Sequence, residues 1–292
     1  MFLTLLFVPG AFGYQTVSPD ASMVLVGNTR GHNVVAFSLK GAYLGEVLKA
    51  EDPDHLQLYD GSLYVSVGAA VVKCEVPTLE VVSVDCSPFA IGGGLSRPRG
   101  FVFGDDGLYV SSYDAILKFD ANNGTFLEVF AKGTDFNHLA LDDHKLYATT
   151  QGQKIFVFDL ETKTKKIFVD DVEPIGVSLL GIRIFDQDVW VSDFAGGGIR
   201  NYDKSSKALI DTYSTTFTNV THYVGSFDLI DDDTLVAVAF VDDQTNWPGV
   251  LLTYDISSGD SQSNFDPSRN FLLRQEEDNN LLLKRPVGCL VI

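Results

Sequence analysis

RPRGFVFGDDGLYVSSYDAILKFD, residues 97–120, decides the fold of this chain. Short runs of aromatic and β-branched residues stand before and after an Asp-Asp-Gly turn, which is the pattern of two antiparallel strands joined by a hairpin. A third apolar stretch follows and ends in an aromatic residue and an acid, Phe119 and Asp120. The polar stretch and the apolar alternation of residues 121–130 then predict a turn and a fourth strand.

The same pattern recurs along the whole chain, and no segment sustains a helical period. A new copy opens every 38 to 62 residues, a length that suits four strands. One such sheet cannot bury both of its apolar faces alone, so the copies must stack as blades in a ring. The copies open at His55, Gly100, His138, Gly181, Ser226 and Gly288.

This spacing predicts an all-β fold, a six-bladed β-propeller of four-stranded antiparallel blades. The chain ends in the middle of a copy, because RPVGCLVI at residues 285–292 matches the start of residues 97–103. Stretches that begin at Ser22, Asn33 and Ala42 are the expected second, third and fourth strands of a blade. We therefore expect the C-terminal strand to complete the N-terminal blade, which removes two exposed sheet edges.

An alternative takes YQTVSP, from Tyr14, as a first strand, which makes the C-terminus a truncated seventh blade. In both arrangements residues 14–292 form a single propeller domain. The apolar residues 1–13 are predicted to be a signal peptide, although they carry no basic segment. The Asn-x-Thr triplets at Asn123 and Asn219 fit glycosylation on that route. The expected location is therefore secreted or extracellular, with a soluble intracellular protein as the alternative.

The chain carries 21 basic and 39 acidic residues, for a net charge of −18. Such a surface repels phosphate backbones and anionic lipids, which argues against nucleic-acid and membrane-surface binding. No stretch reaches the roughly 18 uninterrupted apolar residues of a membrane span. We expect a soluble monomer whose acids lie mostly in solvated turns.

Three cysteines do not make a disulfide framework. Cys74 occupies the position that Phe119 holds in its own copy, and Cys289 matches Phe101. Both positions are apolar elsewhere in the repeat, so we expect two buried free thiols. Cys86 lies in a connecting stretch and its role stays open.

Residues 97–120 resemble NHL-type repeats and the wider six-bladed propeller group of TolB-like proteins and gluconolactonase relatives. The resemblance covers nearly the whole chain, but this fold hosts lyases, lactonases and binding modules alike. It implies that the strand opening each copy is innermost. It also implies that the loops entering that strand share one face, the top face, with the loops between the second and third strands. Binding residues are expected around the central pocket on that face.

Histidines are the first candidates at this pocket. His55 and His138 hold equivalent positions two blades apart, and His222 lies in the loop entering a blade two further on. Three imidazoles converging on the axis would suit zinc, in an arrangement similar to that of the peptidylglycine amidating lyase. The other interpretation is that these are polar residues bonded to neighbouring loops.

Arg99 and Asp193 are the candidate catalytic residues. An arginine there would grip a carboxylate or carbonyl oxygen, and an aspartate would serve as a base or metal ligand. They would otherwise pair with each other or with loop backbone. The resemblance to gluconolactonase relatives implies a calcium or magnesium site of oxygen ligands, for which the candidates are Glu51, Asn137, Glu173 and Asp193.

Tyr113, Asn137 and Trp247 complete the expected ligand-binding set. Trp247 lies in the longest loop between second and third strands, residues 242–249, where an aromatic ring suits a sugar, peptide or cation. The first functional hypothesis is a module that binds a small molecule, peptide or protein through the top-face pocket. The alternative is a metal-dependent lyase or hydrolase that uses the pocket histidines with zinc or calcium.

Overall fold

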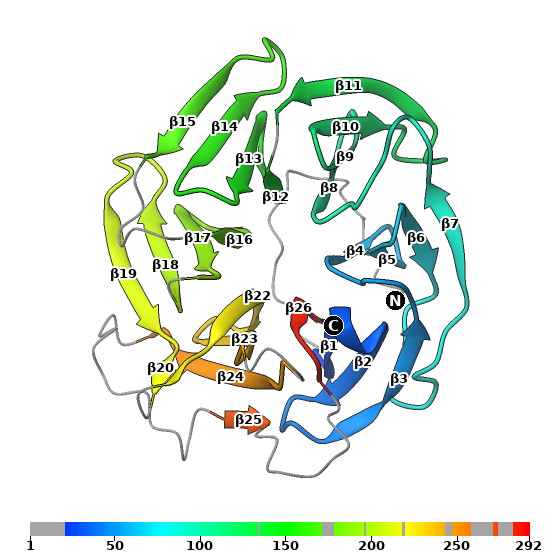
Figure 1. Cartoon of the computed structure of the whole chain (residues 1–292), viewed down its shortest axis with the longest axis vertical. Helices are drawn as coiled ribbons and strands as arrows, with labels where there is room; N and C mark the ends of the chain where they lie inside the picture. The colour runs from blue at the N-terminus through cyan, green and yellow to red at the C-terminus, as the bar shows by residue number, and fades with distance from the viewer. Residues whose placement is uncertain are drawn as a thin grey trace, which may run out of the picture.

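The computed structural model describes most of the chain in the residue ranges that close this paragraph. Six four-stranded antiparallel sheets surround a central axis, as predicted (Figure 1). Glu173 and Asn219 lie outside the described residues, as does the predicted signal peptide. The described residues are 21–133, 135–170, 178–195, 197–217, 220–242, 247–257, 271–273 and 283–292.

Each blade runs from an innermost strand at the axis to an outermost strand at the rim. The first blade contains β26 (Pro286–Val291), β1 (Met23–Asn28), β2 (Asn33–Ser38) and β3 (Tyr43–Lys49). The second contains β4 (Leu56–Tyr59), β5 (Ser62–Val67), β6 (Ala70–Cys74) and β7 (Cys86–Ala90). The third contains β8 (Phe101–Gly104), β9 (Gly107–Ser111), β10 (Ala115–Phe119) and β11 (Phe126–Lys132).

The remaining blades follow the same order, and short elements lie between some strands. The fourth blade contains β12 (Phe136–Asp142), β13 (Lys145–Thr150), β14 (Ile155–Asp159) and β15 (Lys165–Val169). The fifth contains β16 (Leu179–Phe185), β17 (Asp188–Asp193), β18 (Gly198–Asp203) and β19 (Leu209–Ser214). The sixth contains β22 (Tyr223–Asp231), β23 (Thr234–Phe240), β24 (Gly249–Asp255) and β25 (Phe271–Leu273). The short elements are η1 (Thr29–Gly31), β20 (Thr216–Phe217) and β21 (Val220–Thr221).

The ring closes as the repeat predicted. β26 pairs with β1 in an antiparallel register that places Leu290 opposite Leu25, and the two strands lie side by side in Figure 1. The backbone N–H of Ser22 also donates to the carbonyl of Ile292 at 2.6 Å. The alternative of a seventh blade is therefore wrong, because the C-terminal strand completes the first blade.

The core lies between the blades. Among the described residues, six apolar clusters form, one between each pair of neighbouring blades. Met23 and Leu63, for example, pack in the cluster between the first and second blades, and both are fully buried. Each strand alternates its side chains between the two faces of its sheet, so every blade buries both faces only when a neighbour stands on each side.

Hydroxyl groups on the second strands join neighbouring blades near the top face. In the third blade, Ser111 Oγ accepts the backbone N–H of Gly100 at 2.8 Å and donates to the carbonyl of Asn137 in the fourth blade at 2.5 Å. The same latch recurs in the second, fourth and fifth blades, so these side chains hold the loops that enter the innermost strands. The other latch residues, each with its acceptor carbonyl, are Ser66 with Arg99, Thr149 with Leu180 and Ser192 with Gly225.

One prediction about the cysteines is wrong. Cys74 is not a free thiol, because it forms a disulfide with Cys86. Cys86 begins the fourth strand of the blade, directly opposite Cys74 at the end of the third strand, so the register of β6 and β7 brings the sulfurs together. Cys289 is free and buried, as predicted, and burial strongly raises the pKa of its thiol.

The structure offers no helix that could serve as a membrane span within the ranges it describes.

Candidate functional site

The tops of the innermost strands come very close together at the axis. A Cβ on Gly100 would lie 2.4 Å from the Cα of His138, and one on Gly288 would lie 2.3 Å from the carbonyl oxygen of Asp54. Glycine is therefore required at these two positions by the approach of the next blade. The space at the axis is filled instead by the rings of His55 and His138, whose centroids lie 4.8 Å apart.

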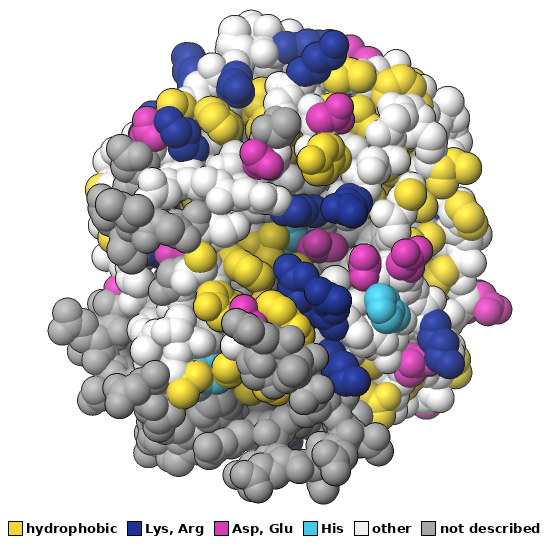
Figure 2. Space-filling model, in the orientation of Figure 1, with side chains coloured by type: hydrophobic (Ala, Val, Ile, Leu, Met, Phe, Trp, Pro, Cys, Tyr) yellow, Lys and Arg dark blue, Asp and Glu magenta, His cyan; other side chains and the backbone are white. Residues whose placement is uncertain are grey.

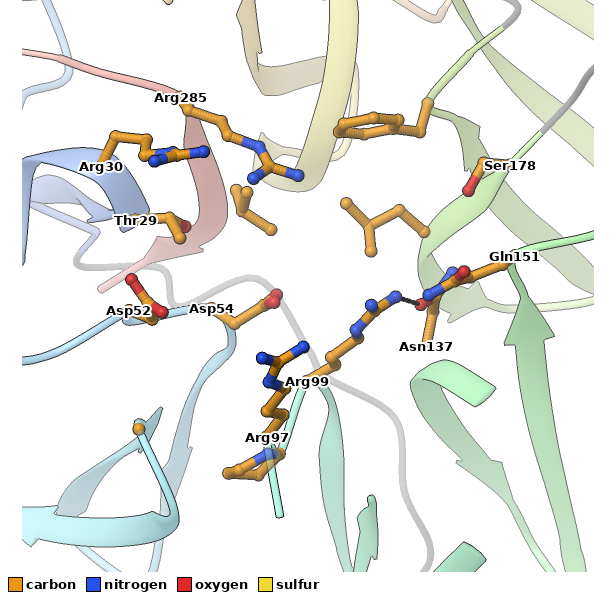
Figure 3. Close-up of a pocket in the computed structure, with 15 residues that line it drawn as sticks. Thr29, Arg30, Asp52, Asp54, Arg97, Arg99, Asn137, Gln151, Ser178 and Arg285 are labelled. Atoms are coloured by element: carbon orange, nitrogen blue, oxygen red, sulfur yellow. Dashed lines mark hydrogen bonds between the residues drawn. The ribbon is translucent and has the colours of Figure 1, made fainter. Parts of the chain in front are cut away.

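A cavity of about 590 Å³ lies above this closely packed level. Its walls come from the loops that enter the innermost strands and from those between second and third strands, on the face where the pocket was predicted. Two positions recur: the residue three before the start of each copy and the residue one before it. Figure 3 shows side chains from several blades facing this space. The first position supplies Asp52, Arg97, Ser178 and Arg285, and the second supplies Asp54, Arg99, Asn137, Leu180 and Val287.

Arginine dominates the charge of this pocket. The lining contains four arginines and two aspartates, a surplus of positive charge in a chain whose net charge is −18. Lys and Arg side chains also cross the middle of this face in Figure 2. The bulk acidity therefore does not describe the pocket. The arginines are Arg30, Arg97, Arg99 and Arg285.

Arg99 is held in place by Asn137. Its Nη1 donates to the Asn137 side-chain oxygen, and the Asn137 amide nitrogen donates to the backbone carbonyl of Leu179 in the fifth blade. Asn137 is only 1% exposed, so it acts as a buried bracket beneath the guanidinium. Arg99 reaches over the pocket from the third blade with its orientation set by the next two blades (Figure 3).

Arg285 is held by aromatic rings. Its guanidinium carbon lies 6.0 Å from the ring centroid of Phe194 and 5.6 Å from that of Trp247. Burial lowers the pKa of Arg285, and the nearby Arg30 and Arg99 lower it further, although Asp54 opposes them. Its buried Nε has no hydrogen-bond partner among the described residues. These features describe a cation whose present surroundings only partly satisfy its charge.

Asp54 connects the pocket to the histidines below. Its Oδ1 lies 2.9 Å from His138 Nε2, and the Asp54 side chain retains 17% exposure whereas that of His138 has none. His55 lies beyond His138, and burial holds the pKa of His55 well below its usual range, with further lowering by His138 and Arg183. A carboxylate with a buried imidazole behind it therefore forms the floor of a basic pocket.

The predicted metal ligands are not gathered into one site. His55 and His138 lie together, but in the part of the chain that is described no group of three His, Cys, Asp or Glu could hold a metal ion. His222 lies at the entry to β22, where its backbone bonds that of Thr215 and burial lowers its pKa. Glu51 is exposed and does not line the cavity. The three histidines thus do not form the expected zinc site, and the calcium set stays a prediction because Glu173 lies outside the described residues.

Only some of the other predicted site residues line the cavity. Arg99 and Asn137 line it, whereas Asp193 is fully buried and pairs with Arg200 at 2.9 Å. Tyr113 is 66% exposed and lies outside the lining. Trp247 reaches the site indirectly, by contacting Arg285.

The expected glycosylation site within the described residues is accessible. Asn123 is exposed in the turn between β10 and β11, where its Oδ1 accepts the backbone N–H of Thr125 at 2.9 Å. Asn219, the other candidate, cannot be placed in the same way because it lies outside the described residues.

Sequence reasoning missed five of the six charged residues in the lining. The signal was the Arg-Pro-x-Gly motif, which stands at residues 97–100 and again at 285–288. In both copies the motif serves to identify the repeat, and its arginine, three residues before the start of the copy, lines the pocket. The same position holds Asp52 in the second blade. A comparison of the residues at that one position across the copies would have revealed the charged lining of the pocket.

Neither a family model nor a curated protein matches this sequence. Solved structures share its architecture. A chain in a nidogen/laminin complex aligns with 92% of this chain and 98% of its own length, with a TM-score of 0.65 and 13% sequence identity. A structure described as a putative 6-phosphogluconolactonase from Bacteroides fragilis aligns with 96% of this chain and 100% of its own length, with a TM-score of 0.56 and 12% sequence identity. The structure of U3-55K aligns with 85% of this chain and 81% of its own length, with a TM-score of 0.55 and 11% sequence identity. At these identities the likeness shows the propeller fold alone.

Proposed function

We propose that the protein is a binding module whose top-face pocket takes a small anionic molecule through carboxylate or phosphate groups. The observation that carries this proposal is the set of four arginines around one cavity of a strongly acidic chain. Guanidinium groups bind both kinds of oxyanion in bidentate, charge-assisted geometry. An anion between them would also relieve the repulsion that Arg30 and Arg99 exert on Arg285.

The size and the second charge of the pocket narrow the ligand class. A volume of about 590 Å³ falls in the range of roughly 300–1,000 Å³ that is typical of small-molecule sites. Asp52 and Asp54 add carboxylate oxygens that accept hydrogen bonds from hydroxyl or amino groups. A molecule that combines an oxyanion with hydroxyl groups fits this lining better than a purely anionic one.

Calorimetric titration at low salt tests the proposal, with inorganic phosphate and citrate as anionic probes and glucose as a neutral one. We expect the two anions to bind and glucose to bind far more weakly. Arg99→Gln and Arg285→Gln should each weaken anion binding about tenfold or more, because one charge-assisted hydrogen bond contributes about 1.5–3 kcal/mol. Lys40→Gln makes the same charge change on an exposed turn and should leave affinity unchanged. Equal anion affinities in all variants would exclude this pocket as the binding site. If acidic peptides bound and the small anions did not, the ligand class would be acidic peptides instead of small anionic molecules.

A second candidate function is hydrolysis or elimination on an anionic substrate, for example a lactone acid. The observation in its favour is Asp54, a carboxylate that reaches a pocket rich in oxyanion-binding groups and is oriented by His138 at 2.9 Å. Such a carboxylate could act as a general base. Turnover of lactone acids, lost in Asp54→Asn with binding retained, would support this candidate. Binding without turnover across such substrates would leave the binding module alone.

The repeat pattern also supports placing the chain with the NHL-like and TolB-like propellers, and we propose a secreted monomer. The disulfide between Cys74 and Cys86 supports that location, because such bonds persist in oxidising compartments. Expression in a secretory host tests it. The protein should appear in the medium with a glycan on exposed Asn123, and retention inside the cell would contradict secretion.

A further inference from the structure

A second cavity lies lower along the axis, separate from the top-face pocket. It measures about 60 Å³ and is surrounded by the innermost strands β4, β8, β12 and β16. Most of its wall is apolar. The polar exceptions are His55, Gln57 and Arg183. No residue lines both cavities, so the arginines of the top-face pocket do not serve this one.

Arg183 is a buried cation that lacks an ion-pair partner among the described residues. It is only 5% exposed, and no carboxylate of the described residues forms an ion pair with it. Within the part of the chain that the structure describes, its side-chain hydrogen bonds go only to backbone carbonyls, those of Ile182 at 3.2 Å and Cys289 at 3.4 Å. Its Nε, also buried, has no hydrogen-bond partner among those residues. Burial of a charge in this state is costly unless something compensates it.

Asp228 is the acid whose charge reaches Arg183, but it is committed elsewhere. One of its carboxylate oxygens accepts the backbone N–H of Val291 at 2.9 Å and the other accepts that of Leu229 at 3.0 Å. Burial raises the pKa of Asp228, although the charge of Arg183 and the two backbone N–H groups oppose this shift. The guanidinium thus has no ion pair with a described carboxylate, and the cavity that it lines has room for a further group.

We propose that this cavity is a binding site for one small monovalent anion of halide type, held by Arg183. The cavity exceeds the roughly 10–15 Å³ that a single water needs, yet it is about a tenth of the top-face pocket. A cation is excluded by the charge of Arg183. The walls of Phe101, Leu139 and Ile182 offer little hydration, so weakly hydrated anions such as bromide and iodide should bind better than fluoride.

Anomalous diffraction from crystals of the whole chain soaked in sodium bromide locates the anion directly. We expect a bromide peak within hydrogen-bond distance of the Arg183 guanidinium. Ordered water alone at that position would overturn the proposal. Because bromide can also occupy the top-face arginines, only the peak at Arg183 counts, and its result is independent of the function proposed for the upper pocket.

Thermal unfolding at constant ionic strength gives a second test. Replacing fluoride by bromide should raise the Tm of the unaltered protein by at least about 2 °C. Arg183→Met removes the buried charge, so the Tm should lose this dependence on the halide. Arg200→Met removes a buried arginine that is already paired with Asp193, and the dependence should remain. The same experiment in an Arg285→Gln background excludes the upper pocket, and an unchanged halide effect in Arg183→Met would refute the assignment.

Discussion

His55 shows at the scale of one residue what the propeller axis does to a titratable group. Its ring packs edge-on against Phe101 at 4.9 Å and against His138 at 4.8 Å, and the side chain is almost fully buried. Burial and the neighbouring charges hold its pKa well below the ordinary value of 6.5. The folded protein therefore keeps His55 neutral under conditions in which the unfolded chain binds a proton.

The first prediction follows from this difference. As the pH falls below 6.5, His55 binds a proton in the unfolded state but not in the folded state, so the free energy of unfolding should decrease. One such group contributes at most about 1.4 kcal/mol per pH unit. Urea unfolding between pH 8 and pH 5 measures the slope, which should become flatter in His55→Gln. His222, whose pKa is also lowered by burial, keeps part of the slope in that variant.

His144→Gln is the matched control, because it removes a histidine that lies on the surface. The slope of its unfolding free energy with pH should equal that of the unaltered protein. If His55→Gln and His144→Gln change the slope equally, burial at the axis is not its cause.

Ser111 carries a second prediction at this scale. Its hydroxyl bonds the N–H of Gly100 and the carbonyl of Asn137, and Asn137 in turn holds Arg99. Ser111→Ala leaves these buried backbone groups without their partner, which should lower the free energy of unfolding by about 1–3 kcal/mol. Anion affinity should fall as well, because the bracket beneath Arg99 loosens. Ser87→Ala, on the exposed face of β7, should change neither quantity.

The disulfide acts at the scale of a blade. It joins β6 to β7 and so ties the outermost strand of the second blade, whose first residues are exposed, to its neighbour. Cys74→Ser with Cys86→Ser should lower the free energy of unfolding by about 3 kcal/mol, as expected for a closed loop of this length. Denaturant unfolding with and without reductant measures the effect. Reductant should destabilise the unaltered protein and leave the double variant unchanged. Equal responses of the two proteins would show that the disulfide does not contribute to the stability of the fold.

The strands were predictable because each obeys a local rule. Residues 101–111 hold two short apolar runs on either side of a turn, which is the local pattern of strands buried on both faces, so it is visible in the sequence. The disulfide was missed because the position of Cys74 was compared only with apolar residues of other blades. Its partner Cys86 becomes adjacent through the register of β6 and β7, which no single strand reveals.

At the scale of the whole molecule, the pocket was predictable in place but not in chemistry. The matching of residues 285–288 with 97–100 identified the copies, and the entry loops were correctly expected to surround the axis. Which side chains point inward depends on how the hydroxyl latches hold those loops. The net charge of −18 also concealed a basic centre, because an average over the surface carries no information about where four arginines meet.

Ring closure leads to the last prediction. β26 supplies the innermost strand of the first blade, and its Leu290 and Cys289 pack in the clusters on the two sides of that blade. A chain cut after Lys284 should lose cooperative unfolding, because two blade interfaces lose their packing together. A circular permutant that joins Ile292 to Ser22, with new ends in the turn at 105–106, should fold, since those two residues already share a backbone hydrogen bond. Circular dichroism and thermal melts distinguish the two chains, and cooperative unfolding of the cut chain would show that closure is dispensable.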